Sequence, residues 1–272
     1  MCVKIGDKGE LFQYPCGKCI ECRLKKSIEW SYRICNELSL YDENMMITLT
    51  YNDDNLPKDG KIRYRDVQLF IKRLRKFFGS RSLRYFACAE YGKKRLRPHY
   101  HIIIFGKMFD DLYFFKKDHK GTFLYRSPRL EKLWIFGFSS VITDITQDVA
   151  IYCAKYLQKD SPNGDKPFCR MSLKPGIGAG FLKDDKINSI LYSDKIYLNG
   201  HYIKTPRYYL NYISRLGDDC ANGVNLIRFS RTKALMDYMD GKDYSFLLGE
   251  VLRKRKKYEK KFQKPLDNDG MI

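Results

Sequence analysis

The sequence has few acidic residues, few histidines and no long apolar run, and each shortage limits what the chain can be. Asp and Glu number 32 against 51 Lys and Arg, which leaves a net charge of +19. Such an imbalance favours a polyanionic partner. No apolar run approaches the roughly 18 residues of a membrane-spanning helix, and no apolar signal-peptide core precedes the nine cysteines. A secreted disulfide scaffold is therefore not expected, and we expect a reduced, cytoplasmic protein without a membrane partner.

A nucleotide-binding P-loop is also missing. The Gly-rich stretch Ser172–Gly180 lacks the Gly-Lys-Ser/Thr ending of that motif and the strand-to-helix context around it, so the sequence predicts no helicase of its own. What the chain does have is aromatic residues, 15% of the total with 21 Tyr, on whose faces unpaired bases can stack. Single-stranded nucleic acid is the leading partner, and a merely soluble basic protein is the alternative.

The stretch Leu83–Phe105, LRYFACAEYGKKRLRPHYHIIIF, predicts a β-hairpin, because two apolar runs of strand length flank a basic loop containing Gly and Pro. In a strand His99 and His101 would share one face. Pairing about the loop centre would put Glu90 opposite His99. Two imidazoles and a carboxylate are a ligand set for a catalytic divalent ion. Polar residues at the solvent end of a strand are the alternative.

The N-terminal region contains a double C-x-x-C motif, Cys16, Cys19 and Cys22, in a 1–40 segment that we treat as a Cys-rich region and helix. With a fourth ligand from Cys2 or Cys35 these thiols would complete a structural zinc site. Buried structural thiols at the start of an amphipathic helix are the alternative.

Between these motifs, Asn44–Tyr51 alternates as a sheet strand, and Tyr64–Phe78 follows the helical period with a basic outer face. Further predicted elements are a helix from Ser127-Pro128, a strand over 137–145, a hairpin through Asn199-Gly200 and a helix from Pro206. The residues we expect to contact DNA are Arg95 and Arg97 in the hairpin loop, and Lys72 and Arg75 on the helix.

A predicted helix carries tandem Tyr-x-x-Lys units, Tyr152 with Lys155 and Tyr156 with Lys159. The tyrosines are four apart and project from one helix face. A phenol is about three pKa units too weakly acidic at pH 7, so its use as a nucleophile needs roughly 4 kcal/mol of anion stabilisation, which a nearby ammonium supplies in part. The alternative is a helix that buries the tyrosines in the core and turns the lysines outward.

Taken in order, these motifs resemble those of HUH endonucleases, the rolling-circle replication initiators, and in particular the replication initiation proteins of gokushoviruses, phages of the Microviridae. The resemblance rests on PCGKCIECR, ITLTY, AEYG followed by RPHYHIIIFG, YCAKYLQK, SLKPGIGAG and PRYY, which span positions 15 to 209.

The resemblance implies an α+β fold, with a central antiparallel sheet of about five strands flanked by helices. It implies an endonuclease core over 41–165, and we assign 166–250 to an accessory region and 251–272 to a basic tail. It implies that His99, His101 and Glu90 hold Mg²⁺ or Mn²⁺, that Tyr152 and Tyr156 are the nucleophiles, and that Lys155 and Lys159 assist them.

The reaction implied is a nick in single-stranded phage origin DNA. It leaves a 5′-phosphotyrosine link and a free 3′-hydroxyl for rolling-circle replication, and religation follows. A host polymerase and helicase would be the partners, in the bacterial host cytoplasm. A plasmid relaxase or a single-strand transposase would use the same chemistry. The alternative from another class is a non-catalytic, zinc-stabilised single-stranded nucleic-acid-binding protein.

Overall fold

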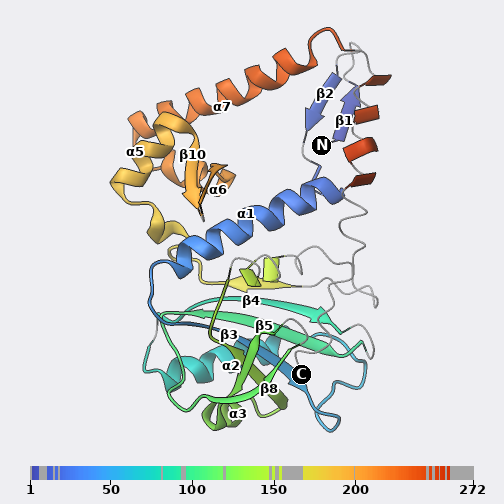
Figure 1. Cartoon of the computed structure of the whole chain (residues 1–272), viewed down its shortest axis with the longest axis vertical. Coiled ribbons are helices and arrows are strands. Elements are labelled where there is room, and N and C mark those ends of the chain that lie inside the picture. Colours follow the sequence, from blue (N-terminus) through green and yellow to red (C-terminus); the bar gives the residue numbers. More distant parts are fainter. Residues whose placement is uncertain are drawn as a thin grey trace. The chain divides into compact units, whose positions relative to one another are not determined.

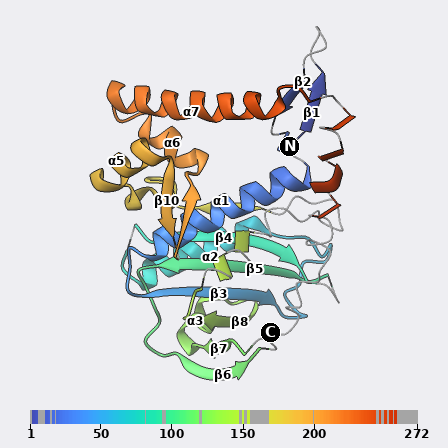
Figure 2. The same cartoon turned by 45° about the horizontal axis from the view of Figure 1, so that its top comes forward.

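The structure is a computed structural model, and it describes residues 2–5, 11–14, 16–17, 19–80, 82–92, 96–118, 121–146, 149–150, 153–154, 168–198, 200–242, 245–246, 249–250, 252–254 and 256–257. Two compact units divide the chain. One contains Arg33–Gly180, and the other contains Met1–Tyr32 and Phe181–Pro265. Figure 1 and Figure 2 show the elements of each unit.

A seven-stranded sheet forms the first unit, and every neighbouring pair in it is antiparallel. The strands in spatial order are β6 (Tyr113–Lys117), β7 (Phe123–Arg126), β8 (Gly137–Ile142), β3 (Asn44–Tyr51), β5 (Pro98–Phe105), β4 (Arg84–Tyr91) and β9 (Cys169–Met171). The α+β class with an antiparallel sheet flanked by helices is confirmed. The sheet is larger than the expected five or so strands, because the β6–β7 hairpin and the short β9 extend its two edges.

One face of this sheet makes the main apolar core. Alternate residues of β3, β4 and β5 point into it, and α2 (Tyr64–Phe77) and α3 (Pro128–Leu133) supply apolar side chains to the same core. From α2 these are Val67, Phe70, Ile71 and Leu74, at the helical spacing read from the sequence. Ser127 caps α3, since its side chain accepts a hydrogen bond of 3.0 Å from the backbone N–H of Leu130.

The other face of the sheet carries the second set of alternating residues. The C-terminal turns of α1 (Ile20–Leu38) contact this side through the buried Glu37. Its carboxylate accepts hydrogen bonds of 2.7 Å from Arg84 of β4 and from the backbone N–H of Gly178. Cys153 also lies on this face, with its Sγ 3.3 Å from the Sδ of Met46. Met46, Thr48 and Thr50 of β3 therefore face away from the main core.

The second unit is mostly helical and has its own small core. It contains β1 (Cys2–Ile5), β2 (Leu11–Tyr14), α5 (Asp184–Ser193), β10 (Lys195–Leu198), β11 (His201–Lys204), α6 (Arg207–Ile213) and α7 (Asp218–Met239). Apolar residues of α5, β10, α6 and α7 pack together around the fully buried Tyr209. The predicted hairpin and the helix from Pro206 are confirmed by β10, β11 and α6. Across the described residues, no helix is both long and apolar enough to cross a bilayer.

Candidate metal site and nucleic-acid interface

The hairpin register brings the predicted metal ligands to one face of the sheet. Glu90 of β4 pairs with His99 of β5, and Cys88 pairs with His101, as the symmetric pairing required. His99 and His101 also pair with Thr50 and Thr48 of β3, so both histidines point away from the main core, whose β5 members include Tyr100 and Ile102. The geometric part of the prediction is thus confirmed, whereas the role of these residues stays a prediction.

Two threonines fix the imidazole rings. Thr48 Oγ1 lies 3.1 Å from His101 Nδ1, and Thr50 Oγ1 lies 2.9 Å from His99 Nδ1. When Nδ1 carries the proton and donates it to the hydroxyl, Nε2 is left with a lone pair for a cation. The sequence motifs did not single out Thr48 and Thr50. Their two-residue spacing in ITLTY matches that of the histidines and was the available signal.

The third predicted ligand lies against one of these lone pairs. Glu90 Oε1 is 3.0 Å from His101 Nε2, and both side chains are buried. A buried carboxylate beside an imidazole nitrogen suits a small divalent cation, which would accept lone pairs from both. The chemistry of this donor set therefore fits the ion that the family resemblance implies.

Gly92, at the end of β4, provides the space for the His99 ring. A Cβ built on Gly92 would lie 2.5 Å from His99 Nε2, closer than real contacts allow. The ring is held at its other nitrogen by Thr50 and cannot easily withdraw. A side chain at position 92 would therefore displace the nitrogen that a metal would use.

The segment that carries the predicted nucleophiles is described in part. Tyr152, Tyr156, Lys155 and Lys159 lie outside the described residues. Cys153, which follows Tyr152 in the sequence, is fully buried against Met46 on the histidine face. Hydrogen bonding with Cys153 and burial together raise the pKa of the Cys88 thiol well above its ordinary value, so both thiols act as apolar packing groups here.

The four predicted DNA-contacting residues have different surroundings. Arg95 lies outside the described residues. Arg97 donates a hydrogen bond of 2.7 Å to the carbonyl oxygen of Tyr51 and forms an ion pair with Asp53. Lys72 and Arg75 belong to α2, which packs on the main core, so the sheet separates them from the histidines. Any DNA contact of Lys72 or Arg75 would be made away from the histidine face.

A second cluster of ligand type lies in the helical unit. The sulfur atoms of Cys16, Cys19 and Cys22 all lie within 4.8 Å of one another, the one set of three metal-ligand side chains this close within the described ranges. Burial and the neighbouring thiols raise the pKa of Cys22, as expected where thiols crowd together. The side chain of Cys2 lies outside what the structure describes, and burial raises the pKa of Cys35 to about 11.

Comparison with known proteins points to phage replication. A family model described as a replication-associated protein of the ORF2 type matches residues 44–161. The replication-associated protein VP4 of Bdellovibrio phage phiMH2K is 33% identical over 78% of this chain and 71% of its own. The replication-associated protein ORF2 of Spiroplasma virus 4 is 30% identical over 93% of this chain and 85% of its own. The replication-associated protein ORF4 of Chlamydia phage 1 is 29% identical over 75% and 54%. No solved structure matches significantly.

Proposed function

Because this chain belongs to the replication-associated protein family of Microviridae phages, we propose that it initiates phage DNA replication by nicking a single strand at the origin. The observation that carries the proposal is the shared face of β3, β4 and β5. On it His99, His101 and Glu90 converge, with two threonines behind the imidazoles. The net charge of +19 supports a DNA substrate.

In this proposal Tyr152 or Tyr156 attacks the scissile phosphate. The new bond joins the phenolic oxygen to phosphorus, the 3′-oxygen leaves as a hydroxyl, and the protein keeps the 5′-phosphate. Lys155 and Lys159 stabilise the phenolate. A divalent cation held by His99, His101 and Glu90 would polarise the phosphate oxygens. The burial of Cys153 on the histidine face supports the approach of Tyr152 to this site.

The phosphotyrosine link keeps the energy of the phosphodiester bond. Attack by a 3′-hydroxyl on the same phosphorus therefore religates the strand without ATP, and the second tyrosine permits a second cleavage after one round of synthesis. The free 3′-end made by the first cleavage would prime a host polymerase, with strand separation by a host helicase.

The proposal is tested with single-stranded genomic DNA of a gokushovirus-type phage and Mn²⁺, followed by a denaturing gel. The wild-type protein is expected to form a covalent adduct, and the double variant Tyr152→Phe with Tyr156→Phe is expected to lose it while still binding DNA. Tyr192→Phe, at a tyrosine that is 96% exposed on α5, is the matched control. An adduct of undiminished yield in the double variant would remove both tyrosines from the reaction.

The clustered thiols favour a second candidate, a zinc-stabilised module that binds single strands without cutting them. Three sulfur atoms within 4.8 Å of one another suit a structural Zn²⁺. The same gel separates the candidates. DNA that stays attached under denaturing conditions supports the nickase, and binding that is only reversed by salt supports the module.

A further inference from the structure

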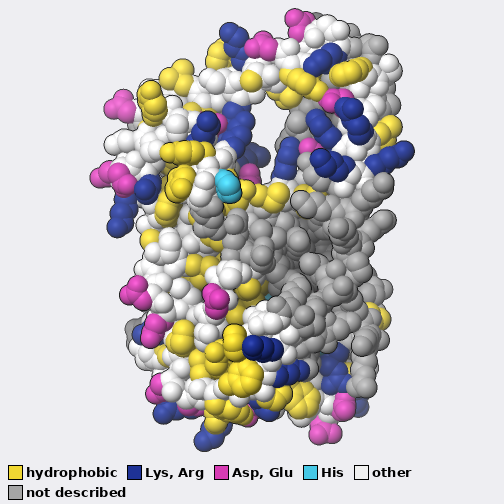
Figure 3. All heavy atoms as spheres, viewed as in Figure 1, with side chains coloured by type: hydrophobic (Ala, Val, Ile, Leu, Met, Phe, Trp, Pro, Cys, Tyr) yellow, Lys and Arg dark blue, Asp and Glu magenta, His cyan; other side chains and the backbone are white. Residues whose placement is uncertain are grey.

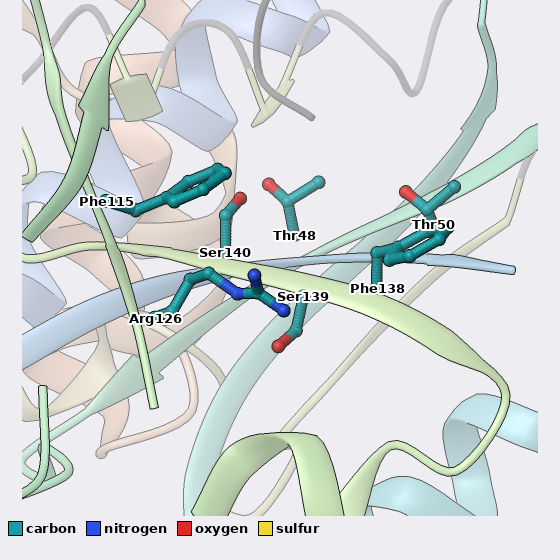
Figure 4. A pocket seen from close by; sticks show the side chains of 7 residues that line it. All are labelled: Thr48, Thr50, Phe115, Arg126, Phe138, Ser139 and Ser140. Atoms are coloured by element: carbon teal, nitrogen blue, oxygen red, sulfur yellow. The ribbon is translucent and has the colours of Figure 1, made fainter. Parts of the chain in front are cut away.

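An open pocket lies beside the histidines on the same face of the sheet. It has about 400 Å³ of free space, which is within the range of small-molecule sites. Thr48, Thr50 and Ser140 line it with hydroxyl groups, and Phe115 of β6, Phe138 of β8 and Arg126 of β7 complete it, as Figure 4 shows. Thr48 and Thr50 are the residues that hold His101 and His99, so this pocket and the candidate metal site share two side chains.

The two aromatic side chains of the pocket are unusually exposed. Phe115 is 43% exposed and Phe138 is 50% exposed, so their rings contribute little to the core and are available to an incoming planar group. A β-bulge contributes to this arrangement, because the pairing of β6 with β7 skips from Phe114 to Lys116 and leaves Phe115 unpaired. Bulges of this kind redirect a side chain, commonly next to functional sites.

Positive charge surrounds these rings. The Arg126 guanidinium lies 5.2 Å from the centroid of Phe115, and the Lys116 ammonium lies 5.3 Å from it. Glu131 holds Arg126 through an ion pair of 2.6 Å, which keeps the guanidinium beside the pocket. On the face drawn in Figure 3, hydrophobic side chains gather beside Lys and Arg side chains over the unit that contains the sheet. The pocket therefore suits a partner that has both a flat apolar face and a negative charge.

We propose that this pocket binds one unpaired base of single-stranded DNA, next to the phosphate that is cut. The base stacks on Phe115 and Phe138, its polar edge meets the hydroxyls of Ser140 and the threonines, and an adjacent phosphate lies beside Arg126. A base inside a duplex could not enter, so the pocket selects single strands. The inference rests on the proposed function and adds to it the residues that recognise the substrate.

The test measures DNA binding separately from cleavage. A fluorescein-labelled, mixed-sequence 20-mer is titrated without divalent cation, and fluorescence anisotropy gives the affinity of each variant. Phe115→Ala and Phe138→Ala are each expected to weaken binding about 5- to 100-fold, the usual loss for one stacked base. The slope of affinity against salt concentration should not change, because no phosphate contact is removed. Phe115→Trp, which keeps a stacking face, should restore binding.

Controls make the outcome specific to the pocket. Tyr192→Ala removes an exposed aromatic ring from α5 and should leave the affinity unchanged. The affinity of every variant for the matching duplex should also be unchanged. Wild-type affinity for the single strand in both Phe115→Ala and Phe138→Ala would overturn the inference. So would an equal loss of affinity for single strand and duplex.

A measurement on the unmodified protein covers the case of a variant that does not fold. A strand that contains 5-iododeoxyuridine is irradiated on the wild-type protein, and the crosslinked peptides are identified by mass spectrometry. Crosslinks to Phe115 or Phe138 support the pocket, and crosslinks that map only elsewhere overturn it. Neither experiment needs a covalent adduct, so a failure of the proposed cleavage would be recognised separately from a failure of the pocket.

Discussion

At the scale of single residues, the hydroxyls of Thr48 and Thr50 should decide how well the histidines bind a cation. Replacing either threonine by valine keeps the shape but removes the group that orients Nδ1. We expect Thr48→Val and Thr50→Val each to weaken Mn²⁺ binding about 10- to 100-fold, measured by titration calorimetry. Thr205→Val is the matched control, because Thr205 is equally buried and its hydroxyl has no hydrogen-bond partner within the described part of the chain. Unchanged Mn²⁺ affinity in both variants would contradict this role.

At the scale of elements, two phenols connect β3 and β5 to the start of α2. The Tyr100 hydroxyl accepts a hydrogen bond of 2.8 Å from the backbone N–H of Arg63, the residue that precedes α2. Tyr51 lies 2.9 Å from Tyr100 and donates to Asp66 at 2.6 Å. Because Tyr100→Phe leaves the N–H of Arg63 without this acceptor, we expect a loss of about 1–3 kcal/mol in the free energy of unfolding, measured in urea. Tyr192→Phe should cost nothing.

The same phenols predict how stability depends on alkaline pH. Burial raises the pKa of Tyr100 to about 12 and also raises the pKa of Tyr51. In the unfolded chain a tyrosine ionises near a pKa of about 10. Between these values the unfolded state loses protons that the folded state keeps, so stability is complete below about pH 10 and falls as the pH rises towards 12. The Tyr100→Phe variant should lose less stability than wild type over this interval.

The start of α1 supplies a separate prediction, that zinc stabilises the helical unit. Cys19 and Cys22 lie at the first turn of α1, and the backbone N–H of Cys19 already contacts the Cys16 sulfur at 3.2 Å. We expect the purified protein to contain one zinc per chain by mass spectrometry, and a chelator to lower its melting temperature. Cys16→Ser should lose the metal, whereas Cys220→Ser, on α7, should keep it. Full zinc content in Cys16→Ser would contradict the site.

The elements that could be predicted from the sequence are those with a clear period. Alternation in Asn44–Tyr51 and the helical spacing of Tyr64–Phe77 predicted β3 and α2 almost residue for residue. The β6–β7 hairpin was not predicted, because the run YFFKK places consecutive aromatic residues across a bulge and so shows no alternation. The candidate ligands followed from spacing within one hairpin. The threonines and the aromatic pocket did not, because they depend on which strands become neighbours in the sheet.

At the scale of the whole molecule, the excess of basic residues should control DNA affinity. Fifty-one Lys and Arg face 32 acidic residues, and every phosphate neutralised releases counterions. For about six contacts to a single strand, affinity should fall roughly 300-fold between about 50 and 200 mM salt. Anisotropy titrations without divalent cation test this. An affinity that hardly changes over this range would show that the charge is not used for DNA.

Thr48 and Thr50 each serve two neighbours at once, an imidazole ring on one side and the pocket on the other. Recognition of the strand and retention of the ion are therefore thermodynamically linked. By reciprocity, whatever factor a bound oligonucleotide adds to Mn²⁺ affinity, Mn²⁺ adds to the affinity for that oligonucleotide. A protein built this way would hold its ion most tightly when the correct strand is already seated, which limits cutting at the wrong place.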